Sequence, residues 1–298
     1  MTSFAIDTGD SYEKRFQIYR EKSGENFRDL DVLKSRLPGA ACSILKETGR
    51  DCLNILSIGS GSGEVDFEIL KMIKAELQAN GYDHYDKMKI FNRAVEPNEH
   101  YINAYEASIS YFQKELGGQV TFDLVKGTFE EYLKKKSDSV RFDVIHWVRS
   151  IYYVEAEQAL RDCFDTELSN GGKVALVLAG ADDLISHVHK MLWPNGKPMK
   201  TEPFELQDVE KILKIADKNG WKNDVSSMQY SLDVTEILDD KSIIGNLLLD
   251  FITQKTNFRE TAEQQKLTDT LELIKKNAVL EDGKYLGRKS SNIVFFYK

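Results

Sequence analysis

The chain has 298 residues, 41% of them hydrophobic and 30% charged, with a formal net charge of −8. This composition is typical of a globular protein. The excess of acidic residues argues against a nucleic-acid partner, which usually needs a basic face. No run of apolar residues approaches the roughly 18 that a membrane span requires. The first residues lack the basic and apolar regions of a secretory signal, so we expect a cytoplasmic protein, and we expect it to be monomeric.

The first predicted element is a polar, helical segment over residues 1–40, which ends in a turn at Leu37-Pro38-Gly39. Short apolar runs and segments with apolar residues at helical spacing then alternate along the chain. The predicted strands are 53–58, 90–96, 120–125, 142–148 and 173–179. The first intervening helix is predicted over 66–79, and two later runs, 228–234 and 292–298, predict strands that close one edge of the sheet.

Alternation of strands and helices requires crossover connections, which place helices on both faces of a parallel sheet. The predicted fold class is therefore α/β, with a Rossmann-like, seven-stranded, mostly parallel sheet in a single domain over residues 1–298. A smaller helical lid or substrate region is predicted from residues 1–40, 184–205 and 235–285, because additions of this kind often cover the carboxyl ends of the strands, where ligands bind.

A glycine-rich loop follows the first predicted strand in the stretch ILSIGSGSGE, with glycines at Gly59, Gly61 and Gly63. A loop of this kind lets a ligand approach backbone N–H groups at the start of a helix. Glu64 follows where a phosphate-binding loop would have Lys and Ser or Thr, and the spacing differs from the dinucleotide motif. The loop therefore favours a cationic adenosine ligand over a pyrophosphate, and S-adenosylmethionine is such a ligand.

An acid stands at the end of the second predicted strand, in Ala94-Val95-Glu96-Pro97. A carboxylate in this place can accept hydrogen bonds from both ribose hydroxyls of an adenosine ligand. The alternative is an acid that is stabilised by the dipole of the following helix. Because the loop and the acid occur at successive strand ends, we interpret Glu96 as a ligand-binding residue.

With these motifs the chain resembles the class I S-adenosylmethionine-dependent methyltransferases, and more narrowly the histamine N-methyltransferase family. The matching stretches are KSRLPG, ILSIGSGSGEVDFEIL, AVEPN, FDVIHWVRSIYYV and NLLLDFITQKTNF. The resemblance implies one methyltransferase domain that N-methylates a small imidazole-bearing amine with S-adenosylmethionine as cofactor.

The resemblance also implies site residues. The expected cofactor contacts are Gly59, Ser60, Gly61, Gly63, Glu96, Tyr101, Thr128, Phe129 and Val148. Glu25 is expected to receive the substrate amine. The expected aromatic wall of the substrate site consists of Tyr12, Phe16, Tyr152, Tyr153 and Phe251, whose faces can hold an imidazole ring and a cation; core packing is the alternative for Tyr152 and Tyr153.

The chain departs from the family pattern at several of these positions. Arg149 and Lys289 stand where the family has a glutamine and an asparagine, and Tyr101 replaces a cofactor-contacting glutamine. Leu184 and Val188 stand in place of substrate-side tryptophans. The two cations either bind a substrate carboxylate or pair with protein acids such as Glu25 or Glu155.

Three functions therefore stay open. The main prediction is a histamine N-methyltransferase-like enzyme, the first alternative an N-methyltransferase for a carboxylate-bearing relative such as histidine or carnosine, and the second a non-catalytic, cofactor-binding regulatory protein. Methyl transfer needs alignment rather than a strong base, so no catalytic residue is assigned.

No metal is expected, because the histidines do not form a paired ligand set: His187 and His189 are interpreted as one helix face and His146 as a buried core residue. The cysteines, Cys42, Cys52 and Cys163, are expected to be reduced thiols.

Overall fold

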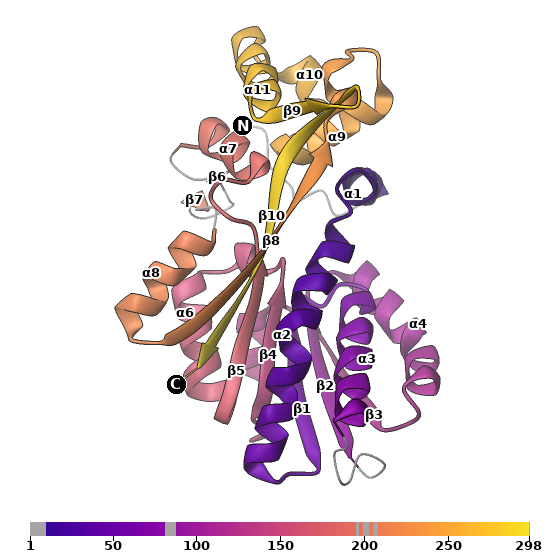
Figure 1. Cartoon of the computed structure of the whole chain (residues 1–298), viewed down its shortest axis with the longest axis vertical. Coiled ribbons are helices and arrows are strands. Elements are labelled where there is room, and N and C mark those ends of the chain that lie inside the picture. Colours follow the sequence, from indigo (N-terminus) through magenta and orange to yellow (C-terminus); the bar gives the residue numbers. More distant parts are fainter. Residues whose placement is uncertain (1–9, 81–87, 195–196, 199–202, 205–207, 298) are drawn as a thin grey trace. The chain divides into compact units, whose positions relative to one another are not determined.

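The computed structural model describes residues 10–80, 88–194, 197–198, 203–204 and 208–297 (Figure 1). Contacts divide the chain into two compact units. The helical unit comprises Met1–Arg28, Ala179–Glu210 and Ser227–Ser291, and the sheet unit comprises Asp29–Leu178, Lys211–Ser226 and Asn292–Lys298. It stays a prediction that residues 1–298 form a single methyltransferase domain, and that residues 1–40, 184–205 and 235–285 form a lid or substrate region. Of the predicted lid and edge-strand residues, 1–9, 195–196, 199–202, 205 and 298 lie outside the described residues.

The central sheet has eight strands. They are β1 (Cys52–Ile58), β2 (Lys89–Glu96), β3 (Val120–Lys126), β4 (Phe142–Val148), β5 (Leu168–Leu178), β8 (Lys222–Asp233), β9 (Ala278–Glu281) and β10 (Lys284–Tyr297). Seven follow one path, β3-β2-β1-β4-β5-β10-β8, and β9 pairs with β10. The first five strands are parallel neighbours, and β10 is antiparallel to β5. The predicted α/β, mostly parallel sheet is confirmed.

Helices cover both faces of this sheet. They are α2 (Glu25–Thr48), α3 (Glu64–Ala79), α4 (Glu99–Glu115), α5 (Phe129–Lys135), α6 (Ala156–Asp162) and α8 (Val209–Asn219), with a 3-10 turn η1 (Ile151–Tyr153) and a π-helical turn η2 (Cys163–Glu167). In Figure 1, α2 and α3 lie in front of the sheet and α6 behind it. Apolar residues at helical spacing, such as Leu70, Ile73 and Leu77, bury one face of α3 against the sheet.

The turn predicted at Leu37-Pro38-Gly39 is wrong, because α2 continues through these residues to Thr48. Proline inside a helix costs about 3 kcal/mol, since it removes a hydrogen bond and clashes with the preceding turn. The apolar face continues on both sides of Pro38, with Leu33, Leu37 and Leu45 at most 1% exposed. Each such leucine contributes roughly 1.5–3 kcal/mol on burial, so tertiary packing outweighs the local signal.

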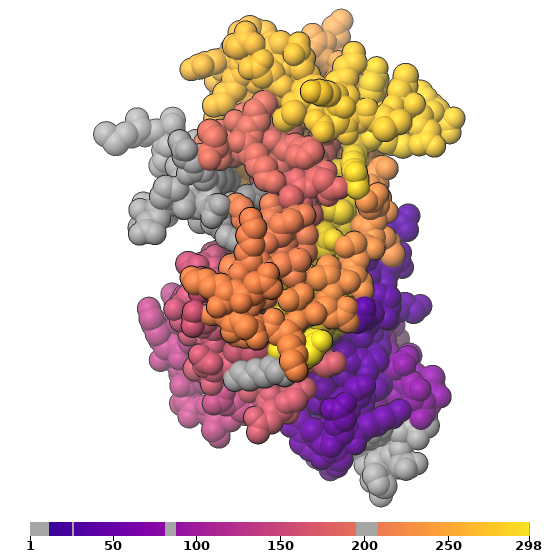
Figure 2. All heavy atoms as spheres, turned by 60° about the vertical axis from the view of Figure 1, so that its left-hand side comes forward, coloured from indigo at the N-terminus to yellow at the C-terminus, as the bar shows by residue number. Residues whose placement is uncertain are grey.

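The helical unit has its own core. Its elements are α1 (Asp10–Ser23), α7 (Leu184–Leu192), β6 (Lys197–Pro198), β7 (Pro203–Phe204), η3 (Thr235–Leu238), α9 (Ile243–Thr253), α10 (Phe258–Thr261) and α11 (Gln264–Lys276). Val188, Leu248 and Phe258 are fully buried in one apolar cluster. Figure 2 shows α7, in salmon, beside the yellow C-terminal segment of the same unit. Within the described part of the chain, no helix has the length and apolarity of a membrane span.

Candidate functional site

The glycine loop joins β1 to α3, and all three glycines have positive φ angles, 70° at Gly59, 57° at Gly61 and 82° at Gly63. L-residues avoid this region. A Cβ atom at Gly59 would lie 2.3 Å from Cβ of Ser150, and one at Gly63 would lie 2.5 Å from the Tyr105 ring. Around Gly61 a Cβ atom would have no neighbour within 4 Å. Packing therefore requires two of the glycines, while the third leaves backbone open to a ligand.

Glu96 is the last residue of β2, and its side chain is hydrogen-bonded to this loop. Its Oε2 accepts the N–H of Gly61 at 2.9 Å, and its Oε1 accepts the N–H of Asn98 at 2.8 Å. Burial raises the pKa of the Glu96 carboxyl, and the two backbone donors partly oppose that increase. The carboxylate is thus oriented by backbone from two directions, with the side chain 6% exposed.

The remaining predicted cofactor residues also belong to the sheet unit and follow strand ends. Thr128, after β3, caps α5 and forms a capping box with Glu131. Phe129 is buried and its ring lies 5.1 Å from Trp147, so its side chain is part of the core. Ser60 is buried in the loop, Val148 is the last residue of β4, and Tyr101 lies half-buried on α4. The carboxyl ends of these parallel strands share one edge of the sheet.

A buried polar network supports the loop, and the sequence analysis missed it. Asp66, on α3, accepts hydrogen bonds from Ser57 at 2.8 Å and from the Tyr105 hydroxyl at 2.9 Å. Asn92 donates to Asp66 at 3.3 Å. Tyr105 is also the ring that excludes a side chain at Gly63. The signal that could have revealed Asp66 is an acid on the otherwise apolar stripe of the predicted helix 66–79.

His146 is buried beside this network, in agreement with its interpretation as a core histidine. Its Nε2 lies 3.6 Å from Oδ1 of Asp66, and neither ring nitrogen has a hydrogen-bond partner among the described residues. Burial lowers its pKa, which favours the neutral ring. His187 and His189 lie on α7, where they contact Asn277 and the Ile252 carbonyl oxygen. The described residues contain no cluster suited to a metal ion, and all three cysteines are free.

Arg149 follows β4 directly and is one of the few non-glycine residues with a positive φ, 55°. Its guanidinium donates to both carboxylate oxygens of Asp29, from Nε at 3.0 Å and from Nη2 at 2.9 Å. Such a bidentate pair is a strong, oriented contact. Glu155, one of the acids suggested as a partner, instead caps α6. The structure therefore supports pairing of Arg149 with a protein acid, but with one that the sequence did not suggest.

Glu25 lies at the start of α2 in a buried cluster of the helical unit. Its Oε1 accepts the hydroxyl of Tyr19 at 2.5 Å and that of Tyr230 at 2.8 Å. Nζ of Lys289 lies 3.9 Å from the same oxygen. Lys289 itself donates to Oδ1 of Asp183 at 2.9 Å. The cluster thus brings together two predicted residues, Glu25 and Lys289, and three that were missed because single tyrosines and an aspartate carry no motif.

The predicted aromatic wall divides between the two units. Tyr12, Phe16 and Phe251 lie in the helical unit, where their ring centroids are 5.8–6.2 Å apart. Tyr19, which was missed, stacks on Phe251 at 4.4 Å. Tyr152 and Tyr153 lie in η1 of the sheet unit, and Tyr153 is 58% exposed, so core packing does not describe it.

Leu184 and Val188, the positions of the family's tryptophans, are fully buried in the apolar core of the helical unit.

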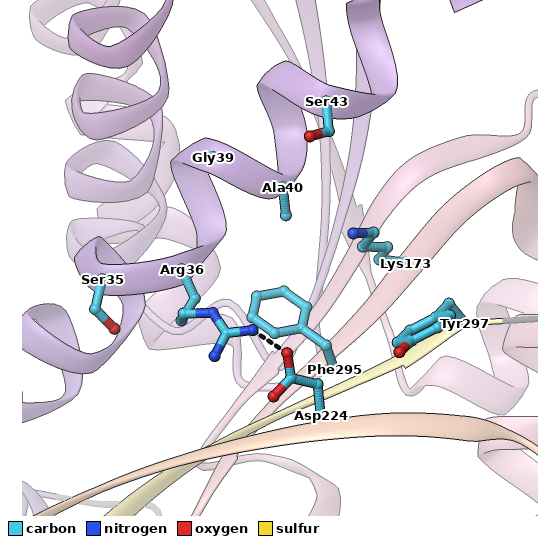
Figure 3. A pocket seen from close by; sticks show the side chains of 9 residues that line it. All are labelled: Ser35, Arg36, Gly39, Ala40, Ser43, Lys173, Asp224, Phe295 and Tyr297. Atoms are coloured by element: carbon cyan, nitrogen blue, oxygen red, sulfur yellow. Dashed lines mark hydrogen bonds and ion pairs between the residues drawn. The ribbon is translucent and has the colours of Figure 1, made fainter. Parts of the chain in front are cut away.

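A separate cavity of about 330 Å³ lies in the sheet unit between α2 and the strands β5, β8 and β10 (Figure 3). Its wall includes Arg36, which pairs with Asp224, and Lys173, whose Nζ lies 5.7 Å from the Tyr297 ring centroid. None of the predicted cofactor or substrate residues lines it. The cavity is therefore distinct from the glycine-loop site.

Comparison with known proteins places the chain near one group of enzymes. No family model matches it. It is 24% identical over 267 residues to histamine N-methyltransferase of Danio rerio, covering 89% of this chain and 87% of the relative. It is 26% identical to histamine N-methyltransferase of Mus musculus, with 88% and 85% covered. It is also 24% identical to carnosine N-methyltransferase 2 of Gallus gallus, with 86% and 76% covered.

Among solved structures, loganic acid methyltransferase with SAH matches at a TM-score of 0.55 and 12% identity, covering 94% of this chain and 96% of that one. At this identity the match shows the fold. The comparisons confirm the predicted resemblance to the histamine N-methyltransferases, the Rossmann-like fold and the predicted class of enzyme, an N-methyltransferase; the predicted cofactor agrees with these relatives.

Proposed function

We propose that this protein transfers the methyl group of S-adenosylmethionine to a ring nitrogen of a small imidazole-bearing amine, as a histamine N-methyltransferase-like enzyme does. The observation that carries the proposal is the geometry of the glycine loop and Glu96. Glu96 accepts the Gly61 N–H at 2.9 Å, next to backbone that has no neighbour within 4 Å of a Cβ position at Gly61. An acid and open backbone at adjacent strand ends suit an adenosine ligand.

The cofactor residues divide into groups with different tasks. Glu96 would accept hydrogen bonds from the ribose hydroxyls, and the backbone of Gly59 to Gly63 would contact the rest of the ligand. Tyr101 and Val148 supply apolar surface. Thr128 and Phe129 contribute through backbone, since the Thr128 hydroxyl caps α5 and the Phe129 ring is buried against Trp147. S-adenosylmethionine, when bound, supplies an activated methyl group for in-line displacement.

The acceptor amine binds at the Glu25 cluster. The carboxylate of Glu25 is buried and accepts hydrogen bonds from the hydroxyls of Tyr19 and Tyr230. A carboxylate held in this way is suited to a charge-assisted hydrogen bond with an alkylammonium ion. Within the helical unit, Tyr12, Phe16 and Phe251 supply aromatic faces that can contact the imidazole ring and the cation. Tyr152 and Tyr153 stay predicted substrate residues of the sheet unit.

The protein's contribution to chemistry is alignment. An imidazole with an ordinary pKa near 6.5 is largely neutral at pH 7, so its nitrogen lone pair is available without a general base. Orientation of two reactants can lower the barrier by roughly 7–11 kcal/mol. Glu25 holds the ammonium and thereby orients the ring. The ring nitrogen would thereby be presented to the methyl group that the cofactor supplies, and the proton on the other ring nitrogen would be released to water.

A carboxylate-bearing acceptor is the second candidate, and the similarity to a carnosine N-methyltransferase favours it. Arg149 and Lys289 are the cations that would bind the carboxylate. Each already has a carboxylate partner in the protein, Asp29 and Asp183 respectively. This pairing weighs against their use for a substrate anion.

The predicted cytoplasmic location and monomeric state stay predictions.

The test is a product assay with purified protein and methyl-labelled S-adenosylmethionine. Histamine, histidine and carnosine are offered separately, and mass spectrometry locates the label. Label on an imidazole nitrogen of histamine is expected. Methyl groups found only on oxygen, on protein or on RNA would contradict the proposal. If the cofactor binds but no acceptor is methylated, the non-catalytic alternative is favoured.

A further inference from the structure

Asp66 is a carboxylate on the otherwise apolar face of α3, and it is 2% exposed. The other buried residues of this helix are Phe67, Ile69, Leu70, Ile73 and Leu77. Burial of a carboxylate is costly, and replacement of a buried charged group by a well-packed apolar residue is often neutral or stabilising. The presence of the acid therefore calls for a reason beyond the packing of α3 against the sheet.

The partners of Asp66 come from the elements that surround the glycine loop. Ser57, on the strand β1 that leads into the loop, donates to Oδ1 at 2.8 Å. Asn92, on the strand β2 that ends in Glu96, donates to Oδ2 at 3.3 Å. The hydroxyl of Tyr105, on α4, donates to Oδ2 at 2.9 Å. One side chain of α3 thus connects three neighbouring elements of the sheet unit.

Tyr105 carries the connection to the loop itself. A Cβ atom at Gly63 would lie 2.5 Å from the Tyr105 ring, so the ring and the loop backbone are in close contact. The hydroxyl of the same ring donates to Asp66 and accepts from Nδ2 of Asn92 at 3.1 Å. These two hydrogen bonds hold the ring in place, and the ring in turn restricts the conformations that the end of the loop can adopt.

We infer that Asp66 is a positioning residue for the cofactor, which acts through Tyr105 to hold the glycine loop in its binding conformation before the cofactor arrives. This inference rests on the proposed function, because it assumes that S-adenosylmethionine binds at this loop. A preorganised loop loses less conformational entropy on binding, so the affinity is higher. Loss of the contact between Asp66 and Tyr105 should therefore appear as weaker binding of the cofactor.

Tyr105→Phe tests the inference, because it removes only the hydroxyl and keeps the ring against Gly63. The dissociation constant of S-adenosylhomocysteine, measured by titration calorimetry well below the unfolding temperature, should rise about fivefold or more, since a hydrogen bond to a carboxylate is lost. The KM for S-adenosylmethionine should rise by a similar factor, and by more than kcat falls. A structural role alone would lower Tm and leave the dissociation constant unchanged, and that result overturns the inference.

Hydrogen exchange examines the loop in the cofactor-free protein. The N–H groups of Gly59 and Gly63 donate to the carbonyl oxygens of Val95 and Ser60, at 2.8 Å and 3.2 Å. In Tyr105→Phe these amides should exchange about fivefold faster or more, because the loop opens more often. Amides of β3 should exchange as in wild type. Unchanged exchange in the loop overturns the inference.

Asp66→Asn provides a second arm, which approaches the same contact from its other partner. The amide has one acceptor oxygen, so it cannot accept from Ser57, Asn92 and Tyr105 together, and S-adenosylhomocysteine should bind about fivefold more weakly or worse. The double variant with Tyr105→Phe should be within about twofold of the weaker single variant, because both substitutions break one contact. Fully additive losses would mean that the two residues act separately, and would overturn the inference.

Ser169→Ala is the matched control. It removes a hydroxyl that donates at 2.6 Å to another buried carboxylate, Asp143, near the amino ends of β4 and β5. Its dissociation constant for S-adenosylhomocysteine should be that of wild type. A rise as large as that of Tyr105→Phe would show that cofactor affinity follows the loss of any such hydrogen bond, and would overturn the inference.

Glu96→Ala separates this inference from the proposed function. If wild type does not bind S-adenosylhomocysteine, or if Glu96→Ala leaves its affinity unchanged, the proposed cofactor site fails, and the inference fails with it. If Glu96→Ala weakens binding by about tenfold or more while Tyr105→Phe and Asp66→Asn do not, the site stands and only the role of Asp66 is wrong.

Discussion

The glycine-loop region and the Glu25 cluster hold their charged side chains in different ways. The loop relies on backbone: glycines with positive φ angles and a single carboxylate, Glu96, that accepts two backbone N–H groups. The Glu25 cluster relies on side chains from separate parts of the helical unit, namely Tyr19, Glu25, Asp183, Tyr230 and Lys289. A region that depends on backbone conformation tolerates little change at its glycines. A cluster of side chains, by contrast, can have its charge and hydrogen bonds altered by single substitutions.

The largest effect is expected for Gly63→Ala. Its Cβ atom would lie 2.5 Å from the buried Tyr105 ring, at a φ of 82°. Left-handed strain costs roughly 1–2 kcal/mol and overpacking about 1–3 kcal/mol, so the free energy of unfolding should fall by about 2–5 kcal/mol. Denaturant unfolding measures this.

Gly61→Ala is the matched control for Gly63→Ala. It has similar strain but open space, so it should lose only about 1–2 kcal/mol of stability. Equal losses in the two variants would mean that the Tyr105 ring moves aside and that packing does not require Gly63.

Glu96→Ala should come next. Loss of a charged hydrogen-bond acceptor costs about 1.5–3 kcal/mol, which corresponds to a weakening of S-adenosylmethionine binding by more than about tenfold. Titration calorimetry measures the dissociation constant. Glu157→Ala, which removes the ion pair between α6 and Lys218, is the control and should leave cofactor affinity nearly unchanged. Unchanged affinity in Glu96→Ala would remove Glu96 from the ribose role.

Arg149→Gln tests a contact between two side chains of the sheet unit, the ion pair of Arg149 with Asp29. The substitution removes the two hydrogen bonds that the buried carboxylate of Asp29 accepts from Arg149; loss of one partner costs about 3–5 kcal/mol in a fully buried pair. Because the Arg149 side chain is 18% exposed, water can replace part of the contact, and we expect a loss of about 2 kcal/mol of stability. The ratio of kcat/KM for histamine to that for histidine should stay constant. A shift of the ratio toward histamine would show that Arg149 binds the substrate carboxylate.

The smallest effect is a pH dependence at Glu96. Its folded-state pKa is raised, chiefly by burial, so the native state binds this proton more tightly than the unfolded chain does. This contribution to stability is fully present below the unfolded pKa and is lost as pH rises through the folded pKa. Between pH 4 and pH 7, the Tm of Glu96→Gln should therefore fall less, or rise more, than that of wild type. Parallel Tm curves would contradict the shift.

Much of the sheet unit could be predicted because its signals are local. Apolar runs such as 142–148 coincide with β4, and the loop 59–63 lies where an α/β topology requires it. Boundaries were less accurate where polar residues and glycines interrupt the apolar pattern, as in β5, which begins at Leu168 rather than at residue 173 and shifts register against β4 in between. The short strand β9 was missed, since four half-exposed or exposed residues do not produce an alternating pattern.

The sequence by itself determined the order of strands and helices, the glycine loop and the acid at the next strand end, because each depends on neighbouring residues and on the period of the backbone. The tertiary structure alone decided the continuation of α2 through Pro38, the partner of Arg149 and the position of Lys289. The physical reason is distance along the chain: Lys289 is 106 positions from Asp183, and Arg149 is 120 positions from Asp29. Pairing between buried charges depends on which side chains folding brings within a few ångströms, and no local periodicity encodes that.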